Sequence, residues 1–444
     1  MSTEEVHNSE TVSMKYLFVF TIGLGFFTTG ITWSLYDSYI PVFLRTFITG
    51  DLQKTIIGFI MVIDNIAAIT LQPYIGAKSD HTWTKWGRRM PYILVGAPMA
   101  ALFFALIPFT WLSMSFWLML ACITVFNIFM AIYRAPVVAL MPDLVPSVHR
   151  SKANGIINLM GGVGAIYAFL VGSYLYEIKD PGLAALFGVP VEHVGAVIAF
   201  LSTSIIMIIA IILLYAAIKE PEKPYEESEE KVGVVQAFRE VIGNKDRSAL
   251  AILLAIMFWF LAYQTLSTWF TTYGIEVLHI TESQASRALT PFALTFVLFA
   301  LPAGFMAGKL GRKNTILVGL VGIIIMMGTV WFTFDYTVLL IELGIAGIFW
   351  AMINVNSIVI VWELATGKKL GAYTGLYYFF SSISAIFGPI LAGMVFDVLT
   401  IGVMFPWAIF LFVIALLFTL MVRTGEAGDE KLVEEALGEV DFEM

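Results

Sequence analysis

The stretch "GAKSDHTWTKWGRRMPYI", Gly76 to Ile93, is a charged interruption between two almost wholly apolar runs. Four basic residues fall within twelve of its positions: Lys78, Lys85, Arg88 and Arg89. Each flanking run is long enough to cross a bilayer, so the stretch is predicted to be a short basic loop between two membrane helices. Such charge can fix the topology of the chain alone, or it can also form ion pairs with acidic residues elsewhere.

The composition indicates a protein whose surface faces lipid. The chain of 444 residues is 59% hydrophobic and 13% charged, whereas a soluble domain carries about 25% charged residues. The net charge of −8 comes from acidic tails at both ends, which we interpret as solvated charge, and it offers no nucleic-acid-binding surface. The first fourteen residues lack the basic segment of a cleaved signal, so the first apolar run is expected to remain as a helix.

Twelve apolar runs are long enough to span a membrane. We place them near 16–43, 55–77, 91–111, 115–140, 154–176, 195–217, 249–274, 285–307, 314–333, 338–362, 371–396 and 403–422. With both termini in the cytoplasm, 20 of the 25 Lys and Arg residues lie on the inner side. This bias predicts a multi-pass protein of the cell (inner) membrane with cytoplasmic termini.

The chain divides into two halves that echo each other. We expect a tail over 1–14, a six-helix bundle over 15–217, a central loop over 218–247, a second bundle over 248–423 and an acidic tail over 424–444. In the central loop, apolar residues at helical spacing predict an amphipathic helix on the membrane surface: Val234, Val235, Phe238, Val241 and Ile242. The alternative for this segment is a helix that binds a partner.

The internal repeat is clearest in the fourth helix of each half. "NIFMAIYRAPVVALMPDL" begins at Asn127 and "GIFWAMINVNSIVIVWEL" at Gly347, so Asp143 and Glu363 occupy matching positions. Duplicated six-helix halves are the layout of secondary transporters, whose substrate site lies at the interface between the halves near the membrane midplane.

The basic loop resembles a motif of the major facilitator superfamily. Gly76 and Asp80, followed by Gly87-Arg88-Arg89, fit the loop between helices two and three of that superfamily. The four additional residues before Gly87, together with "YRAPVVALMPDLVP" from Tyr133, resemble its glycoside–pentoside–hexuronide/cation symporter branch, which includes sucrose/proton symporters. The resemblance implies an all-α integral membrane protein with twelve transmembrane helices in two pseudo-symmetric bundles, and transport without a cofactor.

The acids and bases near the inner helix ends predict a cytoplasmic gate. Arg88 or Arg89 can form a bidentate pair with Asp143, and Arg312 or Lys313 can pair with Glu363. Asp80 is expected to accept hydrogen bonds from the N–H groups of a nearby helix start. The alternative is that these residues set topology only.

Three ionisable residues inside the membrane are candidates for cation coupling: Asp37, Asp64 and Arg134. Together they carry one surplus negative charge, which would attract H⁺ or Na⁺. Because Arg134 stays protonated, one carboxylate can remain ionised beside it while the other binds a proton. The branch that the sequence resembles also includes relatives of the melibiose permease, which carry two cation-binding acids on helix two. Ala68 and Gln72 stand at those positions here, and this difference favours H⁺ over Na⁺. The alternative is a buried structural salt bridge.

Sugars bind to aromatic faces and to amide or hydroxyl groups. The candidate substrate-binding residues are Trp33, Tyr36, Asn127, Gln264, Thr268, Trp350, Asn354 and Tyr377. Such side chains can also join helices to one another or anchor the protein at the membrane surface.

The sequence therefore predicts a monomeric, proton-coupled symporter of a sugar or glycoside. Sodium-coupled sugar symport remains an alternative, as does an exporter or a carrier of a lipid, a drug or a hexuronide-type anion. A membrane enzyme is disfavoured, because the five His residues lie near loops without metal-ligand spacing.

Overall fold

The computed structural model describes residues 16–145, 147–220, 238, 239, 241, 243, 247–364 and 370–423, with the side chains of 147–152, 370 and 371 left out. Both tails, and with them most of the central loop and its predicted amphipathic helix, lie outside the described residues.

Twelve helices in the described part are long and apolar enough to cross a membrane, which confirms the expected fold class. The N-terminal half contains α1 (Tyr16–Leu44), α2 (Gln53–Met61), α3 (Ile63–Asp80), α4 (Met90–Leu112), α5 (Phe116–Leu144), α6 (Ser147–Tyr167), η1 (Ala168–Gly172), α7 (Ser173–Tyr176), α8 (Pro181–Phe187), η2 (Val191–His193) and α9 (Val194–Ala217). The C-terminal half contains α11 (Ser248–Glu276), α12 (Glu282–Ala288), α13 (Thr290–Leu310), α14 (Arg312–Trp331), α15 (Tyr336–Glu363), α16 (Leu370–Leu399), η4 (Ile401–Val403) and α17 (Met404–Leu420).

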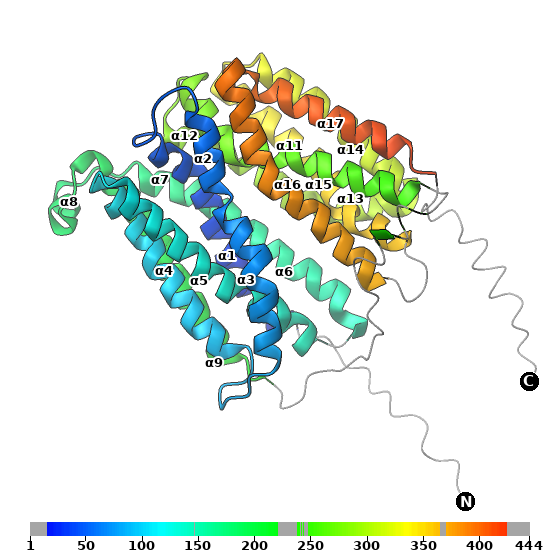
Figure 1. The fold of residues 1–444 in the computed structure, drawn as a ribbon, viewed down its shortest axis with the longest axis horizontal. Helices are drawn as coiled ribbons and strands as arrows, with labels where there is room; N and C mark the ends of the chain where they lie inside the picture. Colours follow the sequence, from blue (N-terminus) through cyan, green and yellow to red (C-terminus); the bar gives the residue numbers. More distant parts are fainter. Residues whose placement is uncertain are drawn as a thin grey trace, which may run out of the picture.

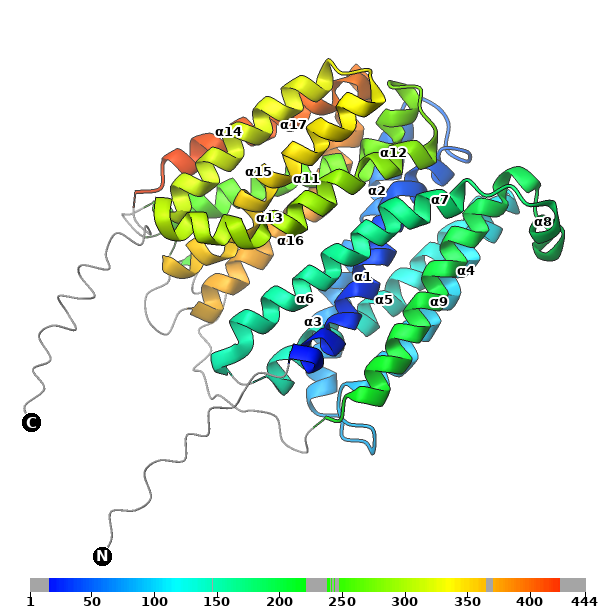
Figure 2. The same cartoon turned by 180° about the vertical axis from the view of Figure 1, so that it is seen from behind.

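The two halves form separate bundles that lie side by side (Figures 1 and 2). One end of the molecule carries the start of α1, the end of α17 and the loop between α3 and α4, and we call it the terminal face. The opposite end carries α8 and α12, and we call it the distal face.

The second membrane helix of each half is broken. The α2 and α3 segments meet at Val62, whose N–H bonds back to the carbonyl of Ile60, and α12 and α13 meet at Leu289, just before Pro291. The sequence predicts continuous helices over 55–77 and 285–307, because hydropathy does not register a local break in hydrogen bonding. Discontinuous helices are typical of substrate and ion sites in transporters.

Small residues allow α2 and α16, which belong to different halves, to approach closely. A Cβ atom on Gly58 would lie 2.6 Å from the carbonyl oxygen of Pro389, and one on Gly393 would lie 3.0 Å from Cα of Thr55. Neither position accommodates a side chain without movement of the backbone. The two halves are therefore in backbone contact along this pair of helices.

Polar contacts join the halves at the distal face. The Asp397 carboxylate accepts hydrogen bonds from the backbone N–H groups of Lys54 (3.0 Å) and Thr55 (2.7 Å), at the start of α2. Ion pairs also cross the interface there: Arg45 with Glu276 at 2.9 Å, and Arg287 with Glu177 at 2.9 Å. Among the described residues, the ion pairs at the terminal face stay within one half. The structure is therefore closed at its distal face.

Candidate substrate and coupling site

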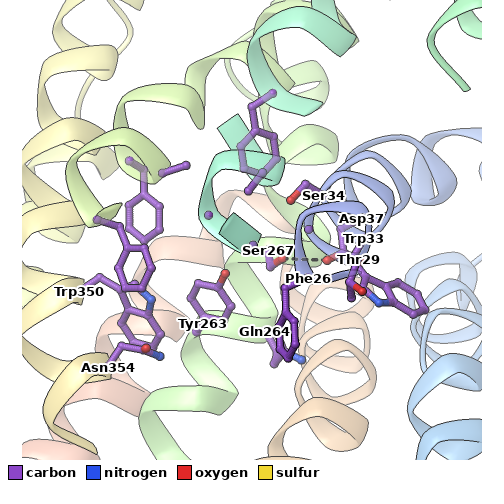
Figure 3. A pocket seen from close by; sticks show the side chains of 18 of the residues that line it. Phe26, Thr29, Trp33, Ser34, Asp37, Tyr263, Gln264, Ser267, Trp350 and Asn354 are labelled. Carbon is purple, nitrogen blue, oxygen red and sulfur yellow. Dashed lines mark hydrogen bonds between the residues drawn. The ribbon is translucent and has the colours of Figure 1, made fainter. Parts of the chain in front are cut away.

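A cavity of about 360 Å³ lies between the halves. Its walls come from α1, α5, α6 and η1 in one half and from α11, α13 and α15 in the other. Six predicted site residues line it: Trp33, Asp37, Arg134, Gln264, Trp350 and Asn354. Helices that face one another across the cavity carry these side chains, so residues far apart in the sequence meet here (Figure 3).

The C-terminal wall of the cavity is aromatic and carries two amides. The rings of Tyr263 and Trp350 are stacked, with centroids 4.6 Å apart and planes 3° from parallel. Gln264 on α11 and Asn354 on α15 stand beside them (Figure 3). A flat aromatic surface next to amide donors and acceptors suits a ligand with an apolar ring face and hydroxyl groups.

The N-terminal wall carries a carboxylate that contacts the other half. Asp37 on α1 accepts a hydrogen bond of 3.1 Å from the hydroxyl of Ser267 on α11 (Figure 3). Ser267 was not among the predicted site residues, although it lies one turn beyond Gln264 on the same helix. This hydrogen bond connects a half-buried ionisable group directly to the contact between the halves.

Asp64 does not line the cavity but lies close enough to interact with the charges of Asp37 and Arg134. It occupies the first turn of α3, directly after the break at Val62. Its carboxylate accepts a hydrogen bond of 2.8 Å from the Asn65 side chain. The same amide nitrogen lies 3.5 Å from the Ala385 carbonyl of α16, so Asp64 too is linked to the opposite half.

Arg134 projects into the cavity and is exposed there. Among the described residues, Arg134 forms no ion pair with Asp37 or Asp64. These three side chains therefore do not form a salt bridge in this conformation. An exposed guanidinium with two membrane carboxylates in its vicinity can attract an anionic group or influence the protonation of those carboxylates.

Four predicted substrate-binding residues are not among those that line the cavity, and their role in binding stays a prediction: Tyr36, Asn127, Thr268 and Tyr377. Tyr36 is fully buried against Trp33 and Phe126, and the Asn127 amide nitrogen lies 3.5 Å from its hydroxyl. Tyr377 lies 3.2 Å from the Ser357 hydroxyl. Helical spacing identifies residues that share a face, but not which neighbouring helix covers that face.

The predicted gate residues form a network at the terminal face. Asp143, at the end of α5, pairs with both arginines: its carboxylate lies 2.6 Å from Arg88 Nη2 and 2.8 Å from Arg89 Nε. Asp80 pairs with Arg89. In the second half Arg312, and not Lys313, pairs with Glu363. Each pair lies within one half, so these contacts do not themselves bridge the halves in this conformation.

Glu220 takes the role that was expected of Asp80. Its carboxylate accepts hydrogen bonds from the N–H groups of Arg88 (2.8 Å), Arg89 (2.9 Å) and Met90 (2.8 Å), at the start of α4. The expectation that Asp80 binds a helix start was therefore wrong. Gly87 adopts φ +104°, and a Cβ there would lie 2.6 Å from Glu220 Cδ, so a glycine is needed for this close approach.

The family model of the Major Facilitator Superfamily matches residues 22–290 and 275–439. The chain belongs to this superfamily. The match covers most of both bundles and agrees with the architecture of two six-helix halves around a central cavity. The identification also supports a transporter in place of an enzyme.

Several curated transporters are similar to the chain. The isoprimeverose transporter of Lactiplantibacillus pentosus is 25% identical over 331 residues, which is 70% of this chain and 63% of the relative. A sucrose transport protein of Oryza sativa subsp. japonica is 33% identical over 78 residues, 18% of this chain and 14% of the relative. The cis,cis-muconate transport protein of Acinetobacter baylyi is 26% identical over 44% of this chain and 45% of the relative. Each of these relatives is matched over less than two thirds of its own length.

Solved transporter structures share the fold. A bacterial homologue of the human lysosomal transporter Spinster, in an inward-facing and unoccupied conformation, superposes with a TM-score of 0.67 at 17% identity, covering 92% of this chain and 95% of that one. A D-xylose-proton symporter gives a TM-score of 0.65 at 17% identity, covering 93% and 99%. At this identity the likeness concerns the fold alone.

Proposed function

We propose that the protein is a proton-coupled symporter of a sugar or glycoside, of the glycoside–pentoside–hexuronide/cation branch, that works by alternating access. The observation that carries the proposal is the cavity between the halves, in which Asp37 faces the stacked pair of Tyr263 and Trp350. The similarity to an isoprimeverose transporter and to a sucrose transport protein supports a sugar as the substrate.

The orientation follows from the distribution of basic residues. We place the terminal face in the cytoplasm, because the loops that end there carry most of the Lys and Arg residues. With this orientation the closed distal face is extracellular, and the structure represents an inward-facing state. Substrate in the cavity would then exchange with the cytoplasm.

Coupling is proposed to act through the contacts of the two carboxylates with the opposite half. Ionised Asp37 accepts the Ser267 hydrogen bond, and Asp64 reaches Ala385 through Asn65. Protonation removes the negative charge to which the Ser267 hydroxyl and the Asn65 amide donate, and so changes how strongly the halves are held together. Because proton and sugar occupy the same interface, each would alter the affinity for the other by the same factor.

Uptake into proteoliposomes tests the proposal, with isoprimeverose and sucrose as probes. We expect accumulation driven by an inward proton gradient, and we expect Asp37→Asn and Asp64→Asn to abolish accumulation while exchange of sugar across the membrane persists. Asp51→Asn is the matched control, because Asp51 is exposed outside the cavity. Full gradient-driven accumulation in both aspartate variants would refute proton coupling through these carboxylates, and uptake that needs Na⁺ but ignores pH would favour sodium coupling.

The exposed Arg134 favours a second candidate substrate, a hexuronide-type anion. Its guanidinium lines the cavity and has no carboxylate partner at ion-pair distance within the described part of the chain, so a substrate carboxylate could occupy that position. The similarity to a cis,cis-muconate transport protein is compatible with this candidate. Competition between a glucuronide and the matching glucoside decides between them: the glucuronide should bind more tightly, and Arg134→Gln should remove that preference.

A further inference from the structure

We propose that the terminal face carries a binding site for the headgroup of an anionic glycerophospholipid. A second cavity of about 600 Å³ lies between the loop that joins α3 to α4 and the end of α9. Its walls include Trp83, Lys85, Trp86, Tyr215 and Lys219. Figures 1 and 2 both show this loop beside the end of α9. The cavity therefore lies where three membrane helices end, and lipid headgroups flank the ends of such helices.

Two lysines of the cavity wall have no acidic partner among the residues that the structure describes. Lys85 and Lys219 are both exposed and form no ion pair with another described residue. Glu220 is the one acid among the described residues of the wall, and its carboxylate accepts hydrogen bonds from the N–H groups at the start of α4. The carboxylate of Glu220 thus interacts with the positive end of the helix dipole of α4 and not with the lysines. The ammonium groups of Lys85 and Lys219 therefore remain available to a phosphate.

The aromatic side chains of the cavity indicate a lipid as the source of the phosphate. Trp83, Trp86 and Tyr215 are 54%, 46% and 41% exposed, and Lys85 Nζ lies 5.3 Å from the centre of the Trp86 ring. Amphipathic rings at this depth pack against the glycerol and upper acyl region of a lipid. A soluble anion would use the lysines but gain nothing from these rings.

The surface next to the cavity can accept acyl chains. Ile212 and Leu213, in the last turns of α9, are 59% and 52% exposed. A lipid whose phosphate lies between Lys85 and Lys219 would continue along this apolar side of the helix into the bilayer. The cavity thus provides contacts for both parts of one molecule, a charged headgroup and an apolar tail.

Native mass spectrometry of the full-length protein with phosphatidylglycerol and phosphatidylcholine tests the proposal. Wild type should retain one phosphatidylglycerol in preference to phosphatidylcholine, and K85Q/K219Q should bind it roughly 30-fold more weakly, as expected for two lysines at the membrane surface. The matched control K309Q/K313Q removes the same charge from the corresponding loop of the second half. Equal losses in both double variants would show diffuse attraction and would overturn the proposal.

Two further measurements separate the lipid from a soluble anion. Glycerol 3-phosphate should fail to displace bound phosphatidylglycerol, and Trp86→Ala should weaken lipid binding with the lysines intact. Displacement by millimolar glycerol 3-phosphate would assign the cavity to a soluble phosphate and overturn the lipid proposal. Unchanged thermal unfolding of the variants without added lipid would establish that the losses come from binding and not from the fold.

Discussion

Asp397→Ala should open the distal face. The Asp397 carboxylate receives two backbone N–H groups and the Thr55 hydroxyl, at 3.0, 2.7 and 2.6 Å, all from the first turn of a helix in the other half. Loss of a helix cap costs about 1 kcal/mol, and hydrogen bonds to a charged acceptor are worth about 1.5–3 kcal/mol. A total of about 2 kcal/mol would shift the equilibrium between closed and open distal faces roughly 30-fold.

Distances between spin labels measure this shift. Leu186 in the N-terminal half and Phe334 in the C-terminal half are each 74% exposed at the distal face. Because Cys122 is the single cysteine of the chain, a Cys122→Ala background allows both positions to be labelled through introduced cysteines. The variant should add a longer distance to the distribution, while wild type should show mainly the short one.

The control is a helix cap of the same chemistry within one half. Asp335 accepts the N–H of Val338 at 2.9 Å and caps α15. Asp335→Ala should therefore lower stability without lengthening the label distance. A distance distribution that is unchanged by Asp397→Ala, or changed equally by both variants, would refute the assignment of Asp397 as a lock between the halves.

Three other outcomes follow from the same structure. Trp350→Ala should weaken binding of the transported sugar about tenfold, as measured by calorimetry, because it removes one ring of the stacked pair. Trp331→Ala, at an exposed position outside the cavity, should leave sugar binding unchanged. Equal effects of the two substitutions would contradict the binding role of Trp350. Burial opposes the charged form of Glu177, but the Ser283 hydrogen bond and the Arg287 ion pair outweigh it and hold the pKa of Glu177 below its usual range. This contact therefore supports the closed distal face above pH about 4.3 and is lost as the pH falls through the lowered pKa. The label distances should lengthen in acid for this reason. A Glu177→Gln variant with the same acid response would exclude Glu177 as the cause of the lengthening. Gly393→Leu should lengthen the same distance at neutral pH, because its side chain would overlap the start of α2, whereas Gly304→Leu, with no atoms within 4 Å of the new Cβ, should leave it unchanged.

Hydropathy was sufficient to predict the twelve membrane helices. A long apolar run in a chain with so little charge faces lipid, and a helix is the structure that satisfies its backbone hydrogen bonds there. The pairing of Arg88 and Arg89 with Asp143 was predictable for a similar reason. Charged groups near the helix ends have few partners, and the internal repeat indicated the matching pair in the second half.

The contacts between elements could not be predicted in this way. Glu220 and Asp397 both cap helices that lie far away in the sequence, and no periodicity indicates which helix start a carboxylate will reach. The burial of Tyr36 and Asn127 depends on the packing of α1 against α5. The break at Val62, which places Asp64 in a first turn, depends on backbone hydrogen bonds that composition does not report.

The cap that Glu220 provides for α4 has a practical consequence for dividing the protein into fragments. Glu220 lies within the predicted central loop but belongs structurally to the N-terminal bundle, because it completes the start of that bundle's third membrane helix. A separately expressed N-terminal fragment should therefore extend through Glu220. A fragment cut after Ala217, where α9 ends, would leave three backbone N–H groups of α4 without their acceptor and would be a poor partner for reassembly with the C-terminal half.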